Sequence, residues 1–99
     1  MNHKLDKATW EKLEYNYNCI LMVADDIIRD CKNPDFNIAT YKMWIKLYVK
    51  ESLHILAGYD YEDNYVMILH GYFELLDNDC YNLTAINGLA KLFGEDYPY

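Results

Sequence analysis

KATWEKLEYNYNCILMVADDIIRDC, residues 7–31, decides the fold class of this chain. Its apolar residues recur at steps of three and four, the spacing of one face of an α-helix. They are Trp10, Leu13, Tyr17, Ile20, Leu21, Ala24, Ile27, Ile28 and Cys31. Asp6 precedes them as a candidate N-cap, and Asn33-Pro34 ends the pattern because the residue before proline is disfavoured in helical conformation. The stretch therefore predicts a helix of about seven turns.

Three further stretches repeat this spacing. The candidate N-caps are Asn37 or Thr40, Asp60 or Asp63, and Asn82. The residues expected to face inward are Tyr41, Trp44, Ile45, Tyr48, Ser52, Ile55 and Leu56, then Val66, Leu69, Tyr72, Phe73 and Leu76, then Leu83, Ile86, Leu89, Ala90 and Phe93. Gly58 stands where a left-handed C-cap is expected. The sequence therefore predicts an all-α fold, a compact bundle of about four helices at approximately 7–32, 38–57, 61–77 and 83–93, in a single domain over 1–99 with a short acidic tail at 95–99.

The acidic residues are distributed unevenly along the chain. The formal net charge is −7, yet residues 1–50 hold seven acids and eight bases. Residues 51–99 hold nine acids and a single base, Lys91. Such a negative field steers association with basic partners and repels nucleic acid and anionic membranes. The acidic half therefore either only keeps the protein in solution or meets a basic protein partner, and we expect no direct nucleic-acid binding and no membrane association.

The cysteines and the hydropathy predict the compartment. Cys19, Cys31 and Cys80 have no short spacing among them, and no secretory leader precedes them. No apolar run reaches the ~18–20 residues of a membrane span. We expect reduced thiols in a cytoplasmic protein, in a bacterial host if a phage encodes it.

Catalytic and metal signatures are incomplete. Glu51 and His54 have the Glu-x-x-His spacing of di-iron bundles, but Met67 stands where the glutamate partner of His70 would be. The run 77–79 opens like a calcium loop, but this loop has no glycine at its sixth position and no glutamate at its twelfth. The prediction is a non-enzymatic protein without cofactor or metal, and an enzyme using Glu51 and His54 or a cysteine is the least favoured alternative.

Eleven tyrosines in 99 residues are the second unusual feature. Tyr17, Tyr41, Tyr48 and Tyr72 fall on apolar stripes, which predicts core positions. Six others lie beside acids in the expected links and tail, where carboxylates and rings suit an Arg- and Lys-rich surface; they are Tyr59, Tyr61, Tyr65, Tyr81, Tyr97 and Tyr99. The predicted partner-binding residues are Tyr59, Asp60, Tyr61, Glu62, Asp63, Tyr65, Asp77, Asp79, Tyr81, Glu95 and Asp96.

These features favour a small acidic, non-catalytic inhibitor or immunity protein that blocks the basic nucleic-acid-binding surface of an enzyme such as a nuclease. Anti-restriction and anti-CRISPR proteins of phages and mobile elements act in this way, and the comparison is by analogy only. The alternative is a homodimeric helical adaptor or structural interaction module. In that alternative, a basic row formed by Lys42, Lys46 and Lys50 meets the acidic half of a second copy.

Overall fold

The structure is a computed structural model that describes residues 5–59, 62–95 and 97–98. Its helices are α1 (Lys7–Asp30), α2 (Ile38–Leu56), α3 (Asn64–Asn78) and α4 (Leu83–Phe93). The described ranges contain no β-strand. The predicted all-α bundle of four helices is thereby confirmed. The third helix begins at Asn64 rather than near residue 61.

Each helix begins after an aspartate or asparagine whose side-chain oxygen accepts a backbone N–H bond, as expected of an N-cap. The acceptors and donors are Asp6 and Thr9 N (2.7 Å), Asn37 and Ala39 N (3.1 Å), Asp63 and Tyr65 N (2.9 Å), and Asn82 and Ala85 N (2.9 Å). The predicted caps Asp6 and Asn82 are therefore correct. Where the sequence left alternatives, the structure selects Asn37 and Asp63.

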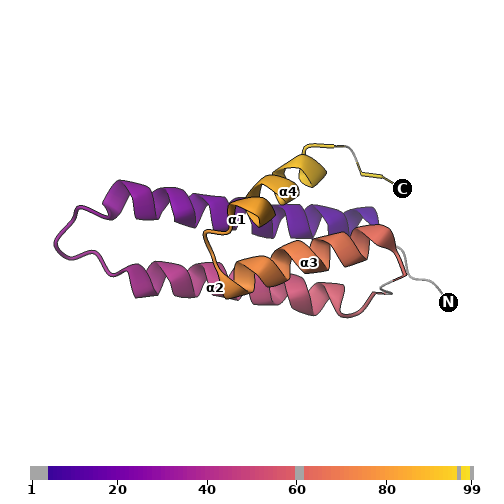
Figure 1. The fold of residues 1–99 in the computed structure, drawn as a ribbon, viewed down its shortest axis with the longest axis horizontal. Coiled ribbons are helices and arrows are strands. Elements are labelled where there is room, and N and C mark those ends of the chain that lie inside the picture. Colours follow the sequence, from indigo (N-terminus) through magenta and orange to yellow (C-terminus); the bar gives the residue numbers. More distant parts are fainter. Residues whose placement is uncertain (1–4, 60–61, 96, 99) are drawn as a thin grey trace.

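α1 and α2 form a long antiparallel hairpin, and α3 and α4 pack on one side of it (Figure 1). The molecule measures 53 × 22 × 22 Å. At about 1.5 Å per residue, the 15 residues of α3 and the 11 of α4 cannot cover helices of 24 and 19 residues. The end of the hairpin that contains the α1–α2 connection therefore projects beyond α3 and α4 (Figure 1). We call residues 24–41 the arm.

The core lies between the α1–α2 hairpin and the shorter helices. One residue expected inside from each helix illustrates it, because Ile20, Ile45, Leu69 and Leu89 are all buried. Trp10 of α1 makes edge contacts with the rings of Tyr65 at 6.0 Å and Phe93 at 5.2 Å, measured between centroids. Aromatic pairs in this orientation stabilise a fold beyond the area that they bury.

Several residues expected inside are exposed. Ile28 is 74% exposed, Trp44 49% and Leu83 70%, and Cys31 and Ala90 are exposed as well. Ile28 and Cys31 lie in the arm, where α3 and α4 provide no cover. Helical spacing identifies a face of a helix but not how far its neighbours extend, so these predictions were wrong. Conversely, Val49 and Ala85 are buried although the sequence did not single them out.

The expected left-handed cap at Gly58 is also wrong. No glycine of the chain has a positive φ. The C-cap of α2 is Ala57, with right-handed helical angles, and its N–H bonds to the carbonyl of Leu53 at 3.0 Å. Gly58 N–H follows with a bond to Ile55 O at 3.2 Å, so α2 ends by tightening its last turn.

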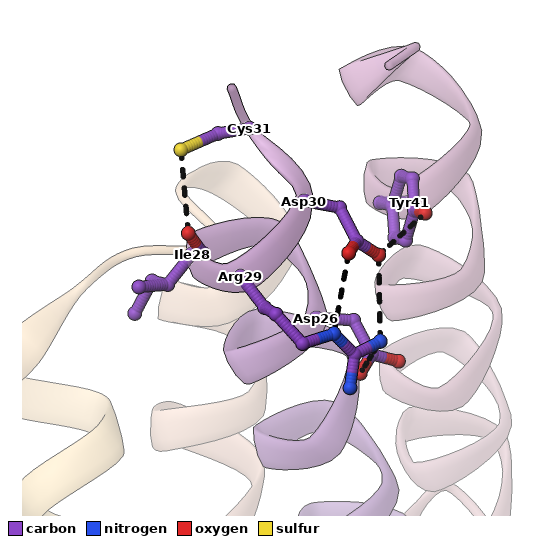
Figure 2. A network of polar contacts seen from close by, with 6 residues as sticks. All are labelled: Asp26, Ile28, Arg29, Asp30, Cys31 and Tyr41. Atoms are coloured by element: carbon purple, nitrogen blue, oxygen red, sulfur yellow. Dashed lines mark hydrogen bonds and ion pairs between the residues drawn. The ribbon is translucent and has the colours of Figure 1, made fainter. Parts of the chain in front are cut away.

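A polar network ties the end of α1 to the start of α2 in the arm (Figure 2). The guanidinium of Arg29 contacts Asp26 at 3.0 Å and Asp30 at 3.2 Å. The hydroxyl of Tyr41 donates to the same Asp30 carboxylate at 3.2 Å. Hydrogen bonds from Arg29 and Tyr41 hold the pKa of Asp30 below its ordinary value. The thiol of Cys31 donates to Ile28 O at 3.3 Å. Cys31 is exposed, so it lies outside the core rather than on a buried stripe.

Candidate partner-binding surface

Three segments that are distant in sequence meet at the end of the molecule opposite the arm. These are the start of α1, the link between α2 and α3, and the residues after α4 (Figure 1). Side chains of all three are in contact, since the hydroxyl of Tyr59 lies 2.8 Å from Oγ1 of Thr9 and the hydroxyl of Tyr97 donates to Leu5 O. We call this region the acidic end; its members are Asp6, Tyr59, Glu62, Asp63, Tyr65, Glu95 and Tyr97.

The tyrosines of the acidic end are held by the fold. Tyr59 and Tyr65 are half-buried, and the ring of Tyr65 packs edge-on against Trp10. Tyr97 packs against the same indole at 6.0 Å between centroids. Burial, then the negative charge of Asp6 and of neighbouring groups, raises the pKa of Tyr97. These rings therefore stabilise the end of the bundle as well as forming part of its surface.

The acids of this end divide into two kinds. Asp6 and Asp63 cap α1 and α3, so their carboxylates are engaged with backbone amides. Hydrogen bonds from the Thr9 side chain and backbone hold the pKa of Asp6 below its ordinary value. Glu62 and Glu95 are exposed and cap no helix. A binding surface at this end would therefore combine the exposed carboxylates of Glu62 and Glu95 with the negative charge of the capping acids.

The remaining described members of the predicted set lie at the other end of α3. Asp79 accepts the backbone N–H of Tyr81 at 3.0 Å, and Asp77 precedes it in the last turn. Because α3 has 15 residues, this group is about 20 Å from the acidic end. The structure thus divides the predicted set between two places. Asp60, Tyr61 and Asp96 lie outside the described residues.

The basic row lies beside this second group. The ammonium of Lys42 stands 5.5 Å from the ring centroid of Tyr81, a cation–π contact. Burial raises the pKa of the Cys80 thiol, and the positive charges of Lys42 and Lys46 oppose that rise. Two of the three lysines are thus close to groups of their own chain. That the row holds a second copy stays a prediction.

The groups considered for catalysis and metal binding are mostly engaged elsewhere. Glu51 bonds to Lys12 at 3.2 Å, and His70 lies 3.5 Å from Glu74. The raised pKa of Cys80 disfavours its reactive thiolate. Within the ranges that the structure describes, no three Cys, His, Asp or Glu side chains are grouped as metal ligands would be.

Exposed apolar side chains on α1 and α2 form the surface that the sequence did not predict. Met43 and Leu47 lie on the outer side of α2, where they line a shallow groove with Ala39 and the basic row. Tyr15 and Met22 of α1 and Trp44 of α2 are about half exposed or more. The signal in the sequence was a second apolar stripe on each helix, which an assignment of one buried face per helix leaves out.

No helix among the described residues is both long and apolar enough to cross a membrane. Comparison with protein-family models, with curated proteins and with solved structures gave no match. Any functional conclusion therefore rests on the surface chemistry of this chain alone.

Proposed function

We propose that this protein is a non-catalytic inhibitor or immunity protein, which docks its acidic end onto the basic nucleic-acid-binding surface of an enzyme such as a nuclease. The observation that carries the proposal is the gathering of acids and tyrosines from three distant segments at one end of the molecule. The negative charge of the acidic end would speed its association with a basic surface on the enzyme.

The packing of the acidic end supports the same function. Tyr59 is tied to Thr9, and Tyr65 and Tyr97 are packed on Trp10. Side chains that are already ordered lose less conformational entropy when a partner binds. Glu62 and Glu95 would supply charge-assisted hydrogen bonds to arginine or lysine, in place of the phosphates of the enzyme's nucleic acid.

Capture from a bacterial lysate at low salt tests this function with two charge-matched variants. The acidic-end variant carries Glu62→Gln and Glu95→Gln, and the arm control carries Asp25→Asn and Asp35→Asn. Both change the net charge of −7 by two, and all four side chains are exposed. We expect the native protein and the arm control to capture a basic nucleic-acid-binding enzyme that excess duplex DNA or RNA displaces. Equal capture by the acidic-end variant would contradict the proposed surface, and capture of only acidic partners would contradict the proposed function.

A further inference from the structure

The side of the α1–α2 hairpin that α3 and α4 leave uncovered carries an apolar stripe on each helix. We call it the seam face; it consists of Lys12, Tyr15, Cys19, Met22 and Asp26 on α1, and Trp44, Tyr48 and Glu51 on α2. Within each helix these residues are three or four positions apart, so they share one side of it. Tyr15 is 57% exposed and Met22 65%. The alternation of three- and four-residue steps is also the a/d spacing of helices that pack lengthwise on partners.

Contacts between the two helices place both stripes on the same side of the hairpin. Lys12 Nζ lies 3.2 Å from Glu51 and 5.0 Å from the ring centroid of Tyr15. Cys19 is the largest cause of the raised pKa of Tyr48, so these two side chains are neighbours across the hairpin. Tyr17, by contrast, donates to Ile86 O of α4 at 2.9 Å. Tyr15 lies two positions before Tyr17, about 160° away around the helix, so the seam face is turned away from α4.

We propose that a second copy of this chain packs on the seam face, so that the two α1–α2 hairpins form an intermolecular four-helix bundle. Two adjacent antiparallel helices with a/d stripes match the half of such a bundle.

The charges at the two ends of the seam face set the orientation. Lys12 and Glu51 lie at one end, and Asp26 with its neighbour Arg29 lies at the other. A two-fold axis perpendicular to the helices near Cys19 brings α1 against α1 of the partner in antiparallel orientation. Lys12 and Asp26 are each seven residues from Cys19, so Lys12 of one copy then faces Asp26 of the partner subunit. The apolar centre of the seam face packs against the same residues of the second copy, as an isologous contact requires.

The groove on the outer side of α2 is a weaker site for a second copy. It is lined by residues of a single helix, with the basic row along one flank. Two such faces packed antiparallel about a two-fold axis would bring the basic rows of both copies together. Like charges so placed oppose association. The seam face instead presents both signs of charge.

Sedimentation velocity of the full chain at micromolar to 100 μM concentration tests the proposal. We expect a species of twice the 11.8 kDa chain mass. Met22→Glu with Trp44→Glu should weaken dimerisation at least a hundredfold, while Met67→Glu with Leu83→Glu, at exposed sites on α3 and α4, should leave it unchanged. Circular dichroism of each variant confirms that the helices form. A monomeric native protein, or a dimer that survives the seam-face substitutions, would overturn the proposal.

Charge reversal tests the orientation with milder substitutions. Lys12→Glu and Asp26→Lys should each weaken the dimer several-fold, and the two together should restore most of the loss. Each single change also breaks a contact within its own chain, with Glu51 or Arg29. The thermal stability of each variant is therefore measured on dilute monomer, so that a loss of stability within the chain is distinguished from a loss of dimerisation. Absence of recovery in the double variant would overturn the two-fold arrangement.

Discussion

The side-chain amide of Asn16 donates a hydrogen bond to Oγ of Ser52 at 3.1 Å, between α1 and α2, and both residues are fully buried. The Ser52 hydroxyl in turn donates to Tyr48 O at 2.9 Å. Oδ1 of Asn16 has no hydrogen-bond partner within the described structure. A buried polar pair of this kind fixes the register of two helices at a cost in stability.

The effects of substitutions at Asn16 and Ser52 on the free energy of unfolding should be strongly non-additive. Ser52→Ala leaves the buried Asn16 amide without its acceptor, which should cost about 1–3 kcal/mol. Asn16→Leu combined with Ser52→Ala replaces both partners by apolar groups, so its stability should equal or exceed that of the native protein. Urea unfolding of the two single variants and the double variant measures the coupling. Additive effects would show that the hydrogen bond contributes nothing specific.

Gly71 and Gly88 offer a matched pair of helix-interior glycines. A Cβ at Gly71 would meet no atom within 4 Å, whereas a Cβ at Gly88 would overlap the ring of Tyr72. Gly71→Ala should therefore stabilise by about 0.5–1 kcal/mol, through helix propensity alone. Gly88→Ala should destabilise, because Tyr72 has to leave its place against α4.

The control for Gly88 is the same substitution made in a Tyr72→Ala variant, with stability measured by urea unfolding. Without the ring, Gly88→Ala should be stabilising by about the same amount as Gly71→Ala. A destabilising Gly88→Ala in that background would mean that something other than Tyr72 requires the glycine.

The N-cap of α1 should make stability depend on pH in the acid range. Because the pKa of Asp6 is lowered in the folded protein, its carboxylate contributes stability above the ordinary aspartate pKa of about 3.9. That contribution is lost as the pH falls through the lower folded-state pKa. Asparagine caps without titrating. The stability of the native protein relative to Asp6→Asn should therefore decline from pH 5 to pH 2, and a difference independent of pH would contradict this role.

Tyr17 should produce the opposite dependence at high pH. Burial raises the pKa of its hydroxyl, which donates to Ile86 O. The protonated form therefore contributes stability below the ordinary tyrosine pKa of about 10, and this is lost as the pH rises toward the higher folded-state pKa. Tyr17→Phe should cost about 1 kcal/mol at pH 7. Urea unfolding from pH 7 to pH 11 should show that cost shrinking; a constant cost would exclude the linkage.

Helix positions could be predicted from local signals, because the residues that cap a helix are adjacent to it. Asp6 and Asn82 are clear examples. Which residues are covered could not be predicted in the same way, since Ile28 and Leu83 carry the same spacing signal as buried residues and are nevertheless exposed. Exposure in the arm follows from where the shorter helices α3 and α4 lie along the hairpin, which only the assembled fold reveals (Figure 1).

For the candidate site, the sequence predicted which residue types are present but not how they are arranged in space. Acids and tyrosines at residues 59–65 were evident, but their relation to the tail and to Asp6 depends on contacts between distant residues. Thr9 and Tyr59, for example, are 50 positions apart in the sequence. Tyr65, which packs on Trp10, and Tyr81, which lies against Lys42, are likewise far in sequence from their partners, so these contacts could not be predicted either. The seam face was overlooked because each helix was assigned a single apolar face.

Inhibition of the captured enzyme tests the central claim most directly. Its nucleic-acid cleavage is measured against increasing concentrations of native protein, acidic-end variant and arm control, at ~50 mM and ~500 mM salt. We predict that the native protein and the arm control inhibit equally, and that the acidic-end variant requires several-fold more protein at low salt. The gap should narrow at high salt, where the Debye length falls to about 4 Å. Equal inhibition by all three proteins at low salt, or no inhibition by the native protein, would contradict the account.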